Sequence, residues 1–216
     1  LISQGRLDEA IEVGHECLEL CSLYNLPKNN IYGLLSTVYN MLGKLDDALE
    51  MDRMNLRDVL ASHPEEPHPA LGQVYYSMSR DFIQQQMMDS ALVYAIKSKD
   101  NWSDPVSLGL MIHLNMELEQ YDSATAYCKK SEEIILSSPM WKSHEKILYT
   151  HWSRLESLKG NWDLAAVYSK KVLDRAILDE DKVAILNGYN SLIRSLLKEK
   201  GPYIDSLMFL YQEIRG

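Results

Sequence analysis

The segment 62–69 combines two kinds of side chain that can bind zinc. Histidine nitrogens and carboxylate oxygens coordinate this metal, and the segment holds His63, Glu65, Glu66 and His68. Its sequence, SHPEEPHP, also contains three prolines, which favour a stiff surface connector over a preformed metal site. We therefore expect no metal ligands here.

A second place where chemistry could occur is the run His15, Glu16 and Cys17, which offers a base, an acid and a nucleophile. Neighbouring residues of a helix point to different faces, so these side chains are badly placed to act together. The sequence also lacks the H-E-x-x-H and G-x-S-x-G motifs and a glycine-rich phosphate loop. It predicts no catalytic residues, no cofactor and no enzymatic activity.

Composition limits the partners that this chain can have. With 46% hydrophobic and 25% charged residues, 216 residues are enough to bury a core. The formal charge of −9 has the wrong sign for binding nucleic acid phosphates. Three cysteines, Cys17, Cys21 and Cys128, do not make a disulfide framework. No apolar stretch reaches the roughly 20 residues of a membrane helix. We expect contact with neither nucleic acid nor membrane.

A short phrase recurs along the chain. GRLDEAIE at 5–12 and GKLDDALE at 43–50 are nearly the same, and weaker versions begin at positions 86, 119, 160 and 201. The phrase carries an alanine at five places, spaced 33 to 43 residues apart: Ala10, Ala48, Ala91, Ala124 and Ala165. A recurrence of this length indicates stacked supersecondary units.

Each unit predicts two helices. Apolar residues at intervals of three and four precede the phrase, and the phrase itself opens a second helix with an acidic first turn. Gly5, Gly43 and Gly160 are expected to end the preceding helix in a left-handed conformation. Alanine in the second helix, opposite a small residue such as Ser36 or Ser79 in the first, would let the two helices cross closely.

This pattern resembles the tetratricopeptide repeat (TPR), with a small residue at position 8, an aromatic at 11, glycine at 15 and alanine at 20. The resemblance covers essentially all 216 residues and is strongest at 29–56 and 146–173. Ile112 at position 8, and Asn115 and Glu156 at position 11, depart from it. Most spacings between the repeated alanines also exceed the usual ~34 residues of this family. In this the chain resembles the long repeats of bacterial regulatory proteins.

The resemblance implies an all-α fold, a right-handed α-α superhelix of antiparallel helix pairs. We expect residues 1–216 to form a single TPR-like array and to be a fragment of a longer protein. The approximate repeats are 1–28 (partial), 29–68, 69–104, 105–140, 141–182 and 183–216 (degenerate).

The resemblance also places certain residues of each first helix on the concave, ligand-binding face. The candidates are Thr37, Asn40, Tyr76, Arg80, Gln84, His113, Glu117 and Arg154. Arg80, His113 and Arg154 share one repeat position and could meet acidic or carbonyl groups of an extended peptide. Alternatively, the arginines pair locally with Glu117, Glu156 or Asp81.

The function implied is a protein- or peptide-binding repeat module. We expect it to be the sensing or interaction part of a larger bacterial signalling or transcriptional regulator; the alternative is a scaffold or assembly factor without an effector output. The partner and the oligomeric state stay open. The cytoplasm is favoured as the compartment, and the periplasm remains possible because the parent's N-terminus is not in this sequence.

Overall fold

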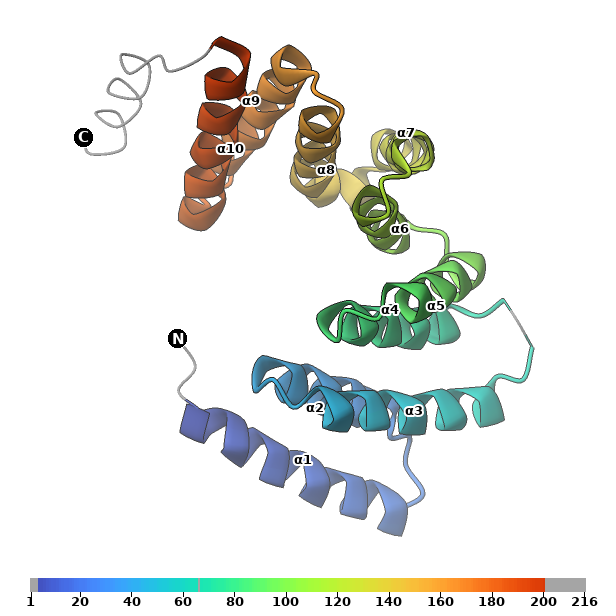
Figure 1. The fold of residues 1–216 in the computed structure, drawn as a ribbon. Helices are drawn as coiled ribbons and strands as arrows, with labels where there is room; N and C mark the ends of the chain where they lie inside the picture. Colours follow the sequence, from blue (N-terminus) through green and yellow to red (C-terminus); the bar gives the residue numbers. More distant parts are fainter. Residues whose placement is uncertain (1–3, 66, 201–216) are drawn as a thin grey trace. The chain divides into compact units, whose positions relative to one another are not determined.

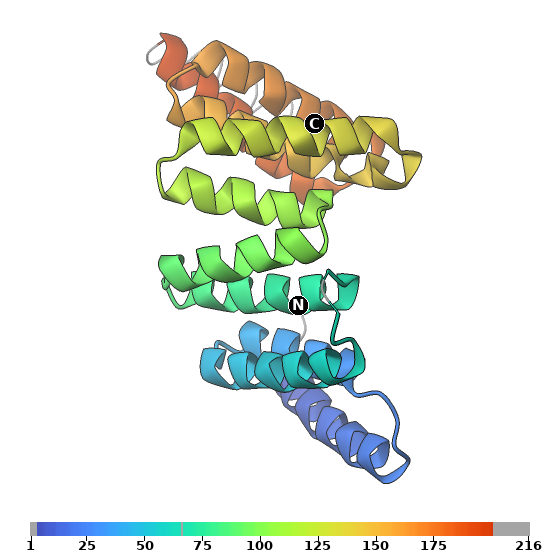
Figure 2. The same ribbon diagram turned by 90° about the vertical axis from the view of Figure 1, so that its right-hand side faces the viewer.

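The computed structural model describes residues 4–65 and 67–200, and in these ranges the chain consists of helices joined by short turns (Figures 1 and 2). The helices are α1 (Gln4–Leu23), α2 (Asn29–Met41), α3 (Leu45–Ser62), α4 (Pro69–Gln84), α5 (Met88–Asn101), α6 (Pro105–Glu117), α7 (Tyr121–Ser137), the 3₁₀ helix η1 (Pro139–His144), α8 (Glu145–Leu158), α9 (Trp162–Leu178) and α10 (Lys182–Lys200). No strand occurs in these ranges, so the predicted all-α fold is confirmed. The phrase that begins at position 201 lies outside the described residues.

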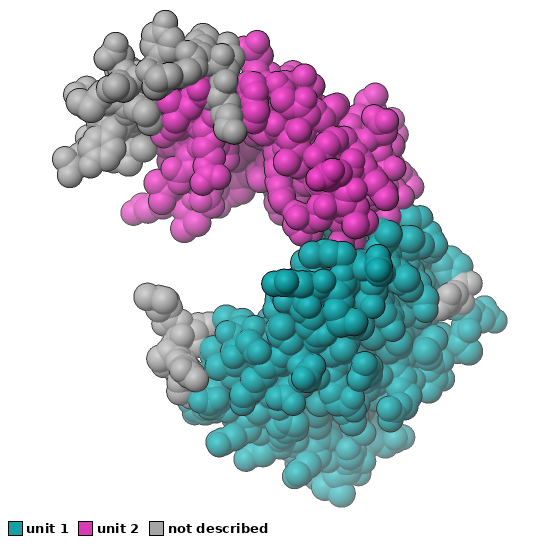
Figure 3. All heavy atoms as spheres, viewed as in Figure 1, with its two compact units in different colours: residues 1–110 teal, residues 111–216 magenta. Residues whose placement is uncertain are grey.

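The chain divides into two compact units, residues 1–110 and residues 111–216 (Figure 3). In the first unit α2 packs against α3, α4 packs against α5, and α3 contacts α4. In the second unit α8 packs against α9, and α9 against α10. The helices of each pair are joined by a tight turn and run antiparallel (Figure 2). Each unit therefore contains the antiparallel helix pairs that the repeated phrase predicts.

Buried alanines mark the places where paired helices cross. Four of the five repeated alanines are fully buried: Ala48, Ala91, Ala124 and Ala165. In the α4–α5 pair the hydroxyl of Ser79 donates to the carbonyl oxygen of Ala91 at 2.7 Å, so two small residues form the contact. Around Ala48 the core is made of large side chains, Tyr32, Leu35, Tyr39 and Met51. This arrangement of small against large agrees with the packing expected from the sequence.

Helix α1 differs from the other second helices. Ala10 is exposed, because the described part of the chain has no helix before α1 to cover it. Gly14 provides the close approach to α2, since an added Cβ there would lie 2.5 Å from Cδ2 of Leu35. The expectation that Gly5 ends a preceding helix is wrong: α1 begins at Gln4, and Gly5 is helical.

The turn inside each helix pair needs one residue in the left-handed region. Gly43 and Gly160 supply it, with φ of 72° and 80°, as predicted. The residues five positions before Ala91 and Ala124 are Gln86 and Glu119, which adopt φ of 61° and 57° without the freedom of glycine. The turn geometry is therefore kept even where the repeat has lost its glycine, because packing of the two flanking helices imposes it.

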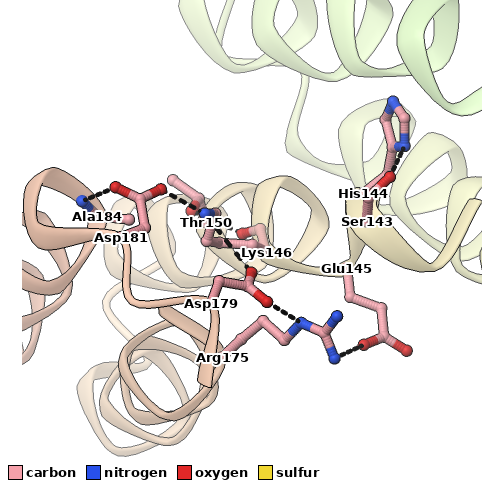
Figure 4. Close-up of polar contacts among 9 residues, drawn as sticks. All are labelled: Ser143, His144, Glu145, Lys146, Thr150, Arg175, Asp179, Asp181 and Ala184. Carbon is pink, nitrogen blue, oxygen red and sulfur yellow. Dashed lines mark hydrogen bonds and ion pairs between the residues drawn. The ribbon is translucent and has the colours of Figure 1, made fainter. Parts of the chain in front are cut away.

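A set of ion pairs ties the start of α8 to the turn between α9 and α10 (Figure 4). Lys146 Nζ lies 2.5 Å from Asp181 Oδ2 and 3.8 Å from Asp179 Oδ2. Arg175 reaches Glu145 at 3.7 Å and Asp179 at 3.4 Å. Asp181 also accepts from the backbone N–H of Ala184 at 3.0 Å, so it caps α10. The Lys146 hydrogen bond, followed by this backbone bond, lowers the pKa of Asp181.

Replacing Gly43 by alanine should lower the stability of the protein through the backbone alone. No atom lies within 4 Å of a Cβ built at this position, so the cost is the left-handed conformation, about 1 kcal/mol for a residue with a Cβ. Thermal unfolding followed by circular dichroism should show a melting temperature lower by roughly 2–4 °C.

The matched control is Gly33→Ala in α2. A Cβ at Gly33 also meets nothing within 4 Å, but this glycine is helical, so alanine should raise stability by about 0.5–1 kcal/mol. Equal effects of the two substitutions would show that φ at position 43 is not what matters.

Candidate functional site

The first unit brings together most of the concave-face residues that the sequence singles out there. Thr37, Asn40, Arg80 and Gln84 line one pocket of about 130 Å³ between α2 and α4. Tyr76 lies beside it, with its ring centroid 5.9 Å from Cζ of Arg80. That distance allows a cation–π contact. The hydroxyl of Thr37 is already used, because it donates to the carbonyl oxygen of Gly33 at 2.9 Å.

The second unit contains the other three candidates, and these interact with one another. Arg154 of α8 donates to Glu117 of α6 through Nη2, and its Nη1 lies 3.2 Å from Nδ1 of His113. Burial, and then the charge of Arg154, lower the pKa of His113, and Glu117 opposes this. Nδ1 of His113 is thus suited to accept from Arg154. The local pairing that the sequence offered as the alternative is present for Arg154 with Glu117.

Two buried carboxyl groups lie next to the first-unit candidates; the sequence offered one, Asp81, only as a local partner for an arginine and did not single out the other, Asp52. Asp52 of α3 and Asp81 of α4 are both 0% exposed. Asn40 Nδ2 donates to Oδ1 of Asp81 at 2.6 Å, and the hydroxyl oxygens of Ser36 and Ser77 lie 3.5 Å apart. Within the described ranges, neither oxygen of Asp52 nor Oδ2 of Asp81 has a partner in normal hydrogen-bond geometry, although Asp52 lies near enough to Asp81 and to the hydroxyls of Ser77 and Ser36 for weaker hydrogen bonding.

Burial changes the charge state of this pair. Burial raises the pKa of Asp52 to about 7; the charge of Asp81 adds to the rise, and the nearby hydroxyls of Ser77 and Ser36 oppose it. Burial also raises the pKa of Asp81, against the lowering effects of Asn40, Asp52 and Arg80. Two carboxyl groups this close titrate as a pair, and near neutral pH we expect them to hold one proton between them.

Asp52 forms part of a groove of about 440 Å³ between α2, α3 and α4. We call it the Asp52 groove; its lining includes Gly33, Leu34, Asp52, Asn55, Val74 and Ser77. Asn55 is 7% exposed, and its side-chain oxygen has no hydrogen-bond partner in the described structure. Ser77 also lines the smaller pocket at Arg80, so the two hollows adjoin along α2 and α4.

Three histidines among the remaining chemical candidates, His15, His63 and His68, make local contacts. Nδ1 of His68 accepts from the backbone N–H of Ala70 at 3.2 Å and so caps α4, and the His63 and His68 rings stack 3.9 Å apart. Glu66 lies outside the described residues. Nε2 of His15 forms a hydrogen bond with the hydroxyl of Tyr39 at 2.9 Å.

Among the described residues, no group of three or more histidines, cysteines or acids is placed to hold a metal ion. No helix in these ranges is long and apolar enough to span a membrane.

Comparison with known proteins identifies the fold. At the level of sequence, no protein-family model and no curated protein matches the chain. Among solved structures, BtubC (BKLC) from P. vanneervenii is similar with a TM-score of 0.71 and 13% identity, over 98% of this chain and 91% of that one. The nearly identical TPR-like repeats assigned to a kinesin light chain of Podosopora anserina give 0.65 and 13%, over 85% and 92%. The chain has a TPR-like repeat fold.

The buried acid pair should make the protein less stable as the pH rises. The folded-state pKa of Asp52, about 7, lies above its ordinary value of 3.8, so the folded protein holds a proton that the unfolded chain releases. The favourable contribution is complete below about pH 4 and is lost through about pH 7, a change of up to about 4 kcal/mol.

Asp52→Asn should remove much of this dependence, because an amide carries no charge and can donate to Asp81. Denaturant unfolding at about pH 5 and pH 8 should show the variant gaining stability relative to the wild type at the higher pH. Glu50→Gln is the control: Glu50 is on the same helix, and its exposed carboxylate contacts only Arg53, at 4.0 Å. Parallel pH profiles for wild type and Asp52→Asn would contradict the raised pKa.

Proposed function

We propose that this chain is a protein- or peptide-binding module and that the Asp52 groove, with the adjoining pocket at Arg80, is its binding surface in the first unit. The supporting observation is that the groove combines a hollow of about 440 Å³ with buried acceptors that have no partner among the described residues. Hydrogen-bonding groups are seldom left unpaired inside a folded protein. A groove that leaves several of them unpaired is suited to a ligand that supplies the missing partners.

The two adjoining hollows favour an extended ligand. A peptide in an extended conformation points successive side chains to opposite sides, so alternate side chains could enter the groove and the pocket beside Ser77. The lining of the groove is partly apolar, through Leu34 and Val74, and partly polar, through Asp52 and Asn55. Sites of this composition bind by apolar contact and select by a few polar groups.

Arg80 and Arg154 have different roles in this proposal. Arg154 is engaged with Glu117, whereas Arg80 stacks on Tyr76 and forms no ion pair within the described part of the chain. Arg80 is therefore the better candidate to meet an acidic or carbonyl group of the ligand. Thr37, Asn40 and Gln84 would contact the same part of it, since they line the same pocket.

For the parent protein, we propose a bacterial signalling or transcriptional regulator in which this array is the sensing or interaction part. The long spacing of the repeated alanines supports it, by its resemblance to regulatory proteins with long repeats. A scaffold or assembly factor is the alternative. The sequence that flanks this chain in its parent separates the two, because a DNA-binding or kinase region is required only by the regulator.

Filling the groove should abolish peptide binding without unfolding the protein. Gly33→Phe places a ring in the groove from a position where a Cβ meets no atom within 4 Å. Peptides selected by the full chain from a random display library should bind this variant at least about tenfold more weakly, about 1.4 kcal/mol, as measured by fluorescence anisotropy.

Ala61→Phe is the matched control, because Ala61 is an exposed residue in the last turn of α3 and lies outside the groove. It should leave the affinity for the selected peptides unchanged, and both variants should melt close to the wild type. If Gly33→Phe binds the peptides as well as Ala61→Phe does, the binding surface is elsewhere.

A further inference from the structure

The unpartnered groups around the Asp52 groove are all acceptors. They are both carboxylate oxygens of Asp52, one of Asp81, and the side-chain oxygens of Asn40 and Asn55. No lysine, arginine or histidine forms an ion pair with Asp52 or Asp81 in the ranges that the structure describes. The charge of Arg80 acts on Asp81 and lowers its pKa against the effect of burial, but the guanidinium lies over the ring of Tyr76. The groove therefore has more acceptors than donors, and it gains negative charge where Asp52 is ionised.

We propose that the Asp52 groove binds a basic side chain, lysine or arginine, of the peptide ligand, with its cationic group donating to Asp52 and Asn55. The inference rests on the proposed function and specifies the ligand that the groove selects. An ammonium has three N–H donors and a guanidinium five, and neither accepts hydrogen bonds. Such a group complements a set of acceptors that carries a negative charge.

The shape of the groove suits the rest of such a side chain. Leu34, Val59 and Val74 form apolar walls, against which the methylene stem of lysine or arginine can pack. Asp52, Asn55 and Ser77 provide polar groups in the lining of the same groove. A short polar side chain would leave the apolar walls uncovered, and an acidic one would be repelled by the carboxyl pair.

Other occupants fit less well. A metal ion would need more ligands than the site has, since no group of three suitable side chains occurs in the described ranges. Water could bridge some of the acceptors, but it would leave the charge of the acid pair without a counterion. A neutral apolar side chain would cover the walls and leave every acceptor unpaired, which is unfavourable in a buried site. A cationic head on an apolar stem meets both requirements.

The direct test uses small probes that imitate one side chain. Nα-acetyl-lysine-N-methylamide and its arginine analogue are titrated into the full chain, and binding is followed by NMR chemical shifts of the backbone amides of Gly33 and Ser77. The norleucine analogue, which keeps the stem and lacks the ammonium, is the neutral comparison. We expect saturable shifts with both basic probes and at least tenfold weaker binding of the norleucine probe. Equal binding of the lysine and norleucine probes would overturn the inference.

The matched variants separate the buried carboxyl from general surface charge. The binding is measured at about pH 8.5, above the pKa of about 7 of Asp52, so that Asp52→Asn removes a buried carboxylate and should weaken the lysine probe at least tenfold. Glu50→Gln removes a carboxylate from the exposed face of the same helix and should change the affinity less than twofold. Thermal unfolding checks that both variants are folded. If both bind the probe like the wild type, or both lose the same affinity, Asp52 does not carry the recognition.

These experiments distinguish failure of the charge selection from failure of the proposed peptide-binding function. Library peptides that bind in a Gly33→Phe-sensitive way but tolerate replacement of every basic residue would refute the charge selection and leave the binding module intact. If no peptide is selected and the lysine probe still binds through Asp52, the groove recognises a cation and the peptide-binding function is wrong.

Discussion

The close crossing of two helices at an alanine is the contact on which the rest of the fold depends. Ala48, Ala91, Ala124 and Ala165 are fully buried, and a larger residue at any of them would push the paired helices apart. Once the helices touch there, large side chains such as Tyr32 and Leu35 close around the contact. One pair buries only part of its apolar surface, so each pair also needs its neighbour. This need brings α3 against α4 and creates the groove between them.

The same packing buries two acids between α3 and α4. Asp52 lies four residues after Ala48 and so shares its buried face, and Asp81 lies three residues after Met78 on the buried side of α4. Taking carboxyl groups out of water is unfavourable unless they find partners. Here the amide of Asn40 bonds one oxygen of Asp81, and the hydroxyls of Ser77 and Ser36 offset the burial of Asp52 only in part. Apolar residues of similar size would make a more stable contact between α3 and α4. Local stability given up in this way is common at binding sites.

The sequence was sufficient for the fold because the features that define it are periodic. A buried alanine recurs in four second helices, at Ala48, Ala91, Ala124 and Ala165, and Gly43 and Gly160 mark their turns directly. Gln86 and Glu119 adopt the same turn without any local signal, since tertiary packing decides their conformation. The site was less predictable. Thr37, Asn40, Arg80 and Gln84 follow from repeat positions, but acids in helices usually face solvent. The available signal was helical spacing, because Asp52 lies four residues after the buried Ala48 and Asp81 three residues after the buried Met78.

Arg80 and Arg154 share one repeat position, but the charges around them differ. In the second unit Arg154 already contacts Glu117 and His113, so an acidic ligand group could use this arginine only by competing with a carboxylate that is held in place. In the first unit the acid pair has no positive partner among the described residues, and a ligand would add the charge that is missing. Binding there replaces no existing ion pair and satisfies acceptors that burial leaves without water. A residue at an equivalent repeat position is therefore not an equivalent binding group, because the neighbouring charges decide what it can still accept.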